Sequence, residues 1–247
     1  MSEVTLFKFY KKSRIPNLNK SPLTYVLKDL SLTKGVNKVW VEFGTTNASN
    51  INEVAAETGS NVFSINNFGG MYSRSAKLLK TKERRKIKER DIIPSASSNV
   101  EYLKGTYMEI LPDFLKNTVG KTGKITLLLF APGIYSTTKY ILDVTKNYMD
   151  PNGCYIIFEK LLNFPHGDVY TQTKDYRQKR SLTCELGKKY LNPRSEAQAL
   201  YDFINQNTGL SVPTSKRKRI TWIGINGGLG TSHYDGRSQM CALKISN

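Results

Sequence analysis

The side chains that most often do chemistry are sparse in this sequence. It holds three cysteines, Cys154, Cys184 and Cys241, and two histidines, His166 and His233. Because the cysteines are odd in number and far apart, they form neither a disulfide framework nor a CxxC-type metal site within one chain. Two histidines exclude most His-rich metal sites, and a Ser-His-Asp triad would need a coincidence. The sequence therefore argues against a zinc site and against triad hydrolysis.

A glycine-rich segment at 224–230 has the composition of a phosphate-binding loop. Such a loop opens a helix, whereas this segment follows one predicted strand and precedes another. We therefore interpret it as the loop of a hairpin.

Positive charge is concentrated in a few segments. The chain has 37 Lys and Arg against 20 Asp and Glu, a net charge of +17, and the windows 74–90, 171–190 and 216–219 carry +15 of it. Such patches are typical of contact with a polyanion, either nucleic acid or an acidic surface of a partner protein. Solvated faces and loops are the alternative interpretation, and for 216–219 a nuclear localisation signal is another.

The candidate polyanion-binding or partner-binding residues come from two of these windows. Strong helix formers fill 74–90, but a helical wheel scatters its charged and apolar residues around the axis, so we expect an arm at about 72–98. A second basic segment, a loop, is expected at about 165–193. The candidates are Arg74, Lys77, Lys80, Lys82, Arg84, Arg85, Lys86, Lys88, Arg90, Lys216, Arg217, Lys218 and Arg219.

The elements that must position these residues alternate between strands and helices. The chain has 247 residues, of which 39% are hydrophobic. This is enough to form the core of one α/β domain over 1–247. Apolar patterns predict a mostly parallel sheet with an antiparallel C-terminal hairpin. The predicted strands are 38–43, 61–65, 100–103, 124–130, 154–158, 220–225 and 239–245. The predicted helices include 22–31, 107–115, 135–148 and 195–205, and a helical pattern also begins near Ile51.

Hydropathy excludes two kinds of targeting segment. No run approaches the roughly 20 apolar residues that span a bilayer. Residues 1–20 lack the continuous apolar core of a signal peptide. We therefore expect an intracellular protein, cytoplasmic or nuclear, without membrane contact.

Several short strings occur in a characteristic order along the chain. They are Val41–Gly44, Ile51-Asn52, Leu103–Gly105, Leu111–Leu115, Tyr135–Lys139, Phe158–Pro165 and Trp222–Asn226. Together they resemble the macrocin O-methyltransferase-like group of class I S-adenosylmethionine (SAM) methyltransferases. The resemblance covers roughly 36–245 and implies a Rossmann-like sheet of seven strands with a reversed last strand.

This resemblance implies a SAM site formed by Glu42, Gly44, Ala48 and Asn66. Two of these positions depart from the family pattern. Ala48 stands where a second glycine lets the backbone approach the cofactor, and Asn66 stands where an acidic side chain binds the ribose. An amide is a weaker acceptor than a carboxylate, so we interpret the four positions as a vestigial site.

The same comparison predicts no metal site. The family carries two aspartates after its fourth strand, where this chain has Ala131-Pro132-Gly133. Divalent cations such as Mg²⁺ need oxygen ligands, which these side chains lack. One acid, Glu159, remains after the fifth strand, beside Lys160. With His166, these two are weak candidates for a general base, and no catalytic residue is assigned.

The sequence thus favours a catalytically degenerate methyltransferase-like protein with no cofactor. Its role would be binding or structural, through the basic segments, with nucleic acid, an acidic partner, copies of itself or a larger assembly such as a virus particle. The alternative is an active SAM-dependent O-methyltransferase with an atypical site.

Overall fold

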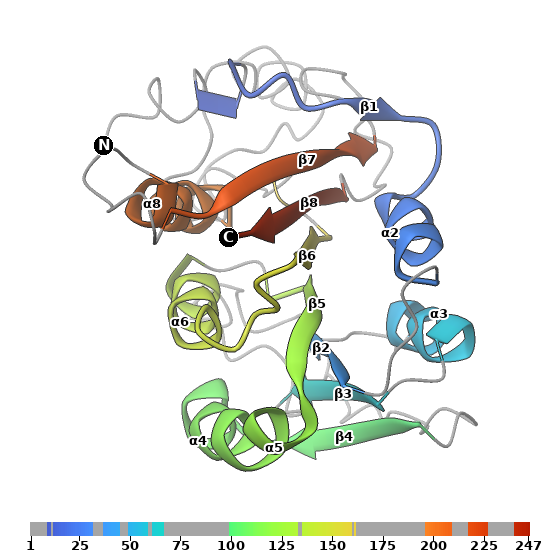
Figure 1. The fold of residues 1–247 in the computed structure, drawn as a ribbon, viewed down its shortest axis with the longest axis vertical. Coiled ribbons are helices and arrows are strands. Elements are labelled where there is room, and N and C mark those ends of the chain that lie inside the picture. Colours follow the sequence, from blue (N-terminus) through green and yellow to red (C-terminus); the bar gives the residue numbers. More distant parts are fainter. Residues whose placement is uncertain are drawn as a thin grey trace, which may run out of the picture.

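A computed structural model gives the fold of this chain (Figure 1). It describes residues 9–10, 12–31, 37–44, 49–58, 61–66, 99–132, 135–159, 161, 196–208, 217–226 and 240–247. The predicted arm at 72–98 and the basic loop at 165–193 lie outside these ranges.

The strands form one eight-stranded sheet in the order β1-β7-β8-β6-β5-β2-β3-β4. β8 is antiparallel to both of its neighbours, β6 and β7, and every other neighbouring pair is parallel. The predicted α/β class, the mostly parallel sheet and the antiparallel C-terminal pair are therefore confirmed. The strands are β1 (Asn17–Leu18), β2 (Lys38–Phe43), β3 (Asn61–Asn66), β4 (Val100–Lys104), β5 (Lys124–Phe130), β6 (Cys154–Phe158), β7 (Arg219–Asn226) and β8 (Cys241–Ser246).

The sheet has one strand more than the family resemblance implies. β1 pairs in parallel with β7, with Asn17 opposite Ile225 and Leu18 opposite Asn226. The amide of Ile225 also donates a 2.8 Å hydrogen bond to the carbonyl of Pro16. A strand of two residues has no alternation that a sequence pattern could reveal, so the seven-strand expectation was wrong at this edge.

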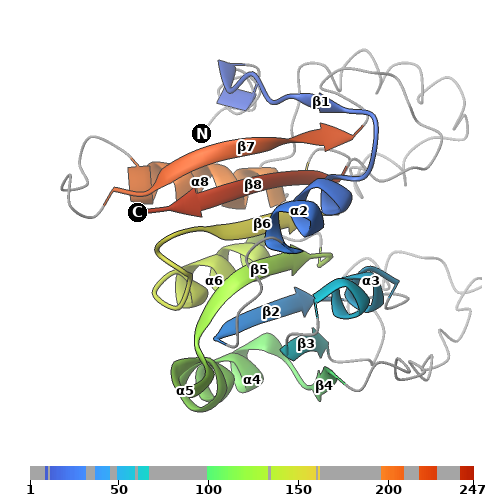
Figure 2. The ribbon, with the colours of Figure 1, turned by 45° about the vertical axis from the view of Figure 1, so that its right-hand side comes forward.

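Helices cover both faces of the sheet (Figures 1 and 2). One face carries α4, the turns that follow it, α6 and α8, and the other carries α2 and α3. The helical segments are α2 (Pro22–Ser31), α3 (Ser49–Thr58), α4 (Tyr107–Asp113), a π-helical segment (Phe114–Val119), α5 (Gly120–Thr122), α6 (Tyr135–Thr145) and α8 (Glu196–Thr208). None of these described helices is long and apolar enough to cross a membrane.

The predicted start of α2 is confirmed in detail. The Oγ of Ser21 accepts a hydrogen bond from the amide of Leu23 at 3.3 Å, and Pro22 occupies the first helical position, where its missing N–H costs nothing.

The predicted helix at 107–115 differs from the structure. Its α-helical part ends at Asp113, and the chain continues as the π-helical segment. Pro112 has no N–H to extend the regular hydrogen-bond ladder, which is the physical reason for the change. α6 likewise ends at Thr145, three residues before its predicted end.

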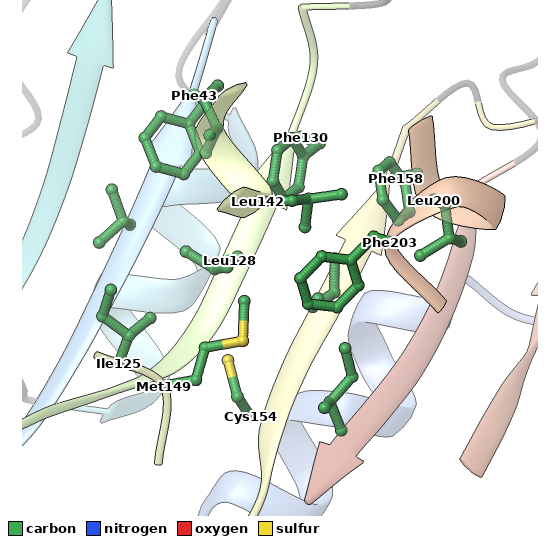
Figure 3. Packing of buried hydrophobic residues seen from close by; sticks show 14 of the residues in the cluster. Phe43, Ile125, Leu128, Phe130, Leu142, Met149, Cys154, Phe158, Leu200 and Phe203 are labelled. Carbon is green, nitrogen blue, oxygen red and sulfur yellow. The ribbon is translucent and has the colours of Figure 1, made fainter. Parts of the chain in front are cut away.

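The core on the α6 and α8 face is centred on three phenylalanines at neighbouring strand ends (Figure 3). The ring centroids of Phe43 and Phe130 are 5.4 Å apart, and those of Phe130 and Phe158 are 4.9 Å apart. All three side chains are fully buried, and Leu200 and Phe203 of α8 pack in the same cluster. Burying each ring is worth about 1.5–3 kcal/mol, so the carboxyl ends of β2, β5 and β6 are firmly held together.

Candidate functional site at the carboxyl edge of the sheet

The structure brings the ends of four parallel strands together at one edge. Backbone hydrogen bonds continue past the strands: the amide of Gly44 donates to Ile65, that of Ala131 to Phe43, and that of Glu159 to Phe130, at 3.2, 2.9 and 2.9 Å. Ligands of open parallel sheets bind outside such an edge. The predicted positions Gly44, Asn66, Ala131 and Glu159 therefore share the edge where a cofactor would lie.

Gly44 sits in a tight turn at the end of β2. Its φ is +79°, a left-handed conformation that favours glycine. A Cβ built on it would lie 3.2 Å from the nitrogen of Pro132 and 3.2 Å from the hydroxyl of Tyr107. The turn is thus closed on one side by the end of β5 and on another by the first residue of α4.

Tyr107 is a residue of this edge that the sequence analysis did not single out. Its ring packs edge-on against Phe43, with centroids 5.8 Å apart. Burial raises the pKa of its hydroxyl well above the usual value, and the carboxylates of Glu42 and Glu196 raise it further. The hydroxyl therefore stays protonated. A capping box could have revealed its place, because Thr106 and Glu109 bond reciprocally and start α4 directly after β4.

Glu42 is present where the resemblance places an acidic side chain, but it is buried, with 2% of its surface exposed. It lies opposite Ser64 in the β2–β3 register, and the Ser64 hydroxyl donates a 3.2 Å hydrogen bond to its Oε2. At least one carboxylate oxygen is therefore already engaged within the sheet.

Asn66 ends β3 and is half-buried. Its carbonyl accepts a hydrogen bond from the amide of Gly105 at 3.1 Å, which ties the end of β3 to the end of β4. The backbone thus holds Asn66 at the cofactor edge, and the group it can offer there is a neutral amide.

The ends of β5 and β6 carry the residues of the implied metal position. Ala131 and Pro132 follow β5, and Glu159 follows β6. The Oε1 of Glu159 accepts a short hydrogen bond from the Nδ2 of Asn50 in α3. Within the described ranges, no three His, Cys, Asp or Glu side chains are grouped as metal ligands. As a donor set, Ala131, Pro132 and an already bonded Glu159 do not fit a cation that takes six oxygen ligands.

A polar network between α6 and α8 lies at the same edge and has no counterpart in the sequence analysis. The hydroxyl of Tyr135 donates to the Oδ2 of Asp202 at 2.8 Å, and the Nε2 of Gln198 donates to its Oδ1 at 2.7 Å. Burial and then the bond to Asp202 raise the pKa of Tyr135 to about 12. The Gln198–Asp202 pair is a local i,i+4 contact on α8, whereas the bond from Tyr135 joins residues 67 positions apart and no local signal could have predicted it.

The remaining predicted site residues are not at this edge or cannot be placed. Ala48, Gly133, Lys160 and His166 lie outside the described residues, as do Lys216 and the candidates in 74–90. Arg217, Lys218 and Arg219 lie at the start of β7, and hence at the opposite, amino edge of the sheet.

Comparison with known proteins identifies the fold. The sequence matches no protein-family model and no curated protein. Among solved structures, 103 chains match. An O-methyltransferase from Bacillus cereus, in complex with SAH, aligns over 98% of this chain and 89% of its own, with a TM-score of 0.51 and 12% identity. The O-methyltransferase TomG from Streptomyces achromogenes, in complex with SAM, aligns over 100% of both chains, with a TM-score of 0.49 and 13% identity. With its sheet order and this likeness, the chain has the Rossmann-like fold of class I SAM-dependent methyltransferases.

Proposed function

We propose that this chain is a methyltransferase-fold protein that has lost methyl transfer and serves in binding or assembly. The observation that carries the proposal is the end of β5. The resemblance implies two metal-binding carboxylates that flank one residue there, and the chain has Ala131-Pro132-Gly133, with Ala131 and Gly133 at the two acidic positions. The nearby Glu159 is bonded to Asn50, so its carboxylate is committed to holding α3 against the end of β6.

The cofactor side of the edge supports the same proposal. A SAM site needs room beside the glycine turn and a strong acceptor for the ribose. Here a Cβ built on Gly44 would lie 3.2 Å from both the Tyr107 hydroxyl and the Pro132 nitrogen. The residue at the ribose-binding position is Asn66, whose side chain is a neutral amide. Losing a charge-assisted hydrogen bond costs about 1.5–3 kcal/mol. We therefore infer weak or no binding of SAM, and no resident cofactor.

The alternative is an active SAM-dependent O-methyltransferase with an atypical site. Glu42 and Gly44 favour it, since both keep the family pattern at the end of β2. This alternative needs a general base in place of the metal, for which Glu159, Lys160 and His166 are the candidates. Membership of the macrocin-like group rests on the sequence strings and is part of the proposal.

The proposed binding role uses the basic segments. With a net charge of +17, the chain would meet nucleic acid or an acidic partner surface through 74–90 and 216–219, in the cytoplasm or the nucleus. Assembly with further copies of the chain is the other form of this role.

Isothermal titration of the full chain with SAM tests the loss of cofactor binding. We expect no saturation below about 100 μM. The variant Asn66→Asp is the matched control, because it restores a charged ribose acceptor, and it should tighten any residual binding by about tenfold, equivalent to 1.4 kcal/mol. A dissociation constant in the low micromolar range for the natural sequence would overturn the loss of cofactor binding in favour of the active enzyme. The Mg²⁺ dependence of any methyl transfer would then distinguish a metal site from a general base.

A further inference from the structure

The amino ends of the parallel strands form a second edge, opposite the candidate cofactor edge. In Figure 2, β2, β5 and β7 begin toward the left of the view, and the chain end marked C lies beside the start of β7. Cations from several elements converge on this edge. We call them the amino-edge cluster: Lys38, Lys124, Lys146, Lys218 and Arg219.

Backbone pairing places the first half of the cluster. Lys38 and Lys124 are register partners at the starts of β2 and β5, and the amide of Lys124 donates to the carbonyl of Asn37 at 3.1 Å. The next amide, that of Ile125, donates to the carbonyl of Tyr148 at 2.9 Å. This bond brings the turn after α6, which contains Lys146, against the start of β5.

Further contacts place the second half. The amide of Lys218 donates to the carbonyl of Asn207 at 2.9 Å, and its Nζ lies 3.3 Å from the Oδ1 of Asn247. The amide of Asn247 in turn donates to the carbonyl of Pro151, before β6. Lys218 and its neighbour Arg219 are thereby fixed beside the amino ends of β6 and β7.

The charges of the cluster act on one another. Burial lowers the pKa of Lys218, the Cys154 thiol opposes this shift, and repulsion from Lys146 adds to it. Lys124 and Arg219 are exposed, and the other three members are half-buried.

Acidic side chains also face this edge. Asp150 lies before β6, within the cluster, whereas Glu57 ends α3, Glu101 begins β4 and Asp113 ends α4, all on its far side. Asp29 is paired with Lys244, with 3.7 Å between Oδ2 and Nζ. Among the described side chains, the amino-edge cluster thus contains five cations and one acid, Asp150, and its net charge is positive.

We propose that the amino-edge cluster binds the phosphate backbone of a nucleic acid duplex. This inference rests on the proposed binding role and assigns it to a surface that joins Lys218 and Arg219 to three lysines from other elements. From β7 to β2 the edge crosses four strand spacings, about 19 Å. A duplex presents a phosphate about every 3.4 Å along each strand, so five cations face about five or six phosphates.

The surface chemistry favours a duplex over the other polyanions. The large exposed apolar side chains among the described residues are Tyr25 in α2 and Met108 in α4, and neither lies at this edge. Single-strand sites use exposed aromatic rings for base stacking, and protein interfaces use apolar anchors at their centre. Five cations at one edge of the sheet, with neither exposed aromatic rings nor apolar anchors among the described residues there, fit contacts to phosphates without base specificity.

Fluorescence anisotropy with a labelled duplex of about 20 base pairs tests the proposal, in DNA and RNA versions, at 50 to 200 mM salt. The edge variant is Lys124→Gln, Lys146→Gln and Arg219→Gln. The matched control is Lys12→Gln, Lys20→Gln and Lys104→Gln, three exposed cations elsewhere with the same change of charge. A third variant neutralises the segment outside the described residues, with Arg84, Arg85, Lys86 and Lys88 changed to glutamine. Thermal melting checks that each variant folds.

Five phosphate contacts predict that the affinity of the natural sequence falls by about 500-fold over this salt range, whereas the two left in the edge variant predict about 12-fold. The control should keep the natural salt slope. Equal losses in the edge and control variants, or loss only in the third variant, would overturn the amino edge as the site and leave the proposed binding role standing. No binding of either duplex by the natural sequence would overturn nucleic acid binding altogether, while the SAM titration would still judge the loss of catalysis.

Discussion

Replacing Gly44 with alanine tests whether the carboxyl edge is closed at the end of β2. The new Cβ would lie 3.2 Å from the nitrogen of Pro132 and 3.2 Å from the hydroxyl of Tyr107. The first of these atoms is backbone, and the preceding residue, Ala131, is bonded through its amide to Phe43 at 2.9 Å. The end of β5 therefore has little freedom to move away.

The structure sets the size of the effect. An L-residue in the left-handed conformation of Gly44 costs about 1–2 kcal/mol. Crowding a packed position adds about 1–3 kcal/mol. We expect Gly44→Ala to lower the free energy of unfolding by about 2–5 kcal/mol. In a chain of this length, each 1 kcal/mol lowers Tm by about 2–4 °C, so Tm should fall by about 4–20 °C.

Urea unfolding followed by circular dichroism, with calorimetry for Tm, measures this change. Gly120→Ala is the matched control for the left-handed conformation, because a Cβ there would lie 3.3 Å from the carbonyl oxygen of Leu115 but Gly120 has a helical φ of −62°. It should therefore cost about 1–2 kcal/mol less than Gly44→Ala. Adding Tyr107→Phe removes one of the two crowding contacts and should return about 0.5–1 kcal/mol to the Gly44 variant. A cost below about 0.5 kcal/mol for Gly44→Ala would refute the reasoning, since the turn would then be free to yield to a ligand.

Local signals were sufficient for most of the fold. The apolar run 124–130 became the buried strand β5, and the Ser21-Pro22 signal marked the start of α2. The pairing of β1 with β7 could not be predicted, because it depends on a proline carbonyl and two residues meeting a strand more than 200 positions away. The π-helical segment after Asp113 was not predicted either, because Pro112 marks an interruption of the regular ladder but helical propensity does not specify which hydrogen-bond register follows it.

The candidate site was predictable only where the topology decides it. Parallel strands end at a common edge, so the positions of Gly44, Asn66 and Glu159 followed from the strand pattern. The bond from Asn50 to Glu159 joins residues 109 positions apart and depends on side-chain conformation, which the sequence pattern does not specify.

The amino-edge cluster is a surface that the sequence pattern predicts only in part. Counting charge in sequence windows found 216–219, because those cations are adjacent in the chain. The same count did not find Lys38, Lys124 and Lys146, because each lies outside the basic windows of the sequence. The sheet order then places the starts of β2, β5 and β7 along one edge, and only this arrangement turns scattered charges into a surface.

Two further predictions concern buried groups. Burial raises the pKa of the Cys154 and Cys241 thiols well above the usual value, so in a Cys184→Ser variant we expect Ellman's reagent to react at pH 8 only as fast as the protein unfolds. Because the unfolded thiols lose protons from about pH 8.5 and the folded ones do not, stability should fall as pH rises above that value, and a flat profile in urea titrations up to pH 10 would contradict this. The last prediction uses the buried 2.6 Å bond from Trp40 Nε1 to the hydroxyl of Thr126. Trp40→Phe leaves that hydroxyl buried without its donor and should cost about 1–3 kcal/mol, plus the loss of ring packing. Adding Thr126→Val removes the stranded hydroxyl, so the double variant should be more stable than the sum of the single costs implies, whereas strict additivity in urea unfolding would show that the bond contributes nothing.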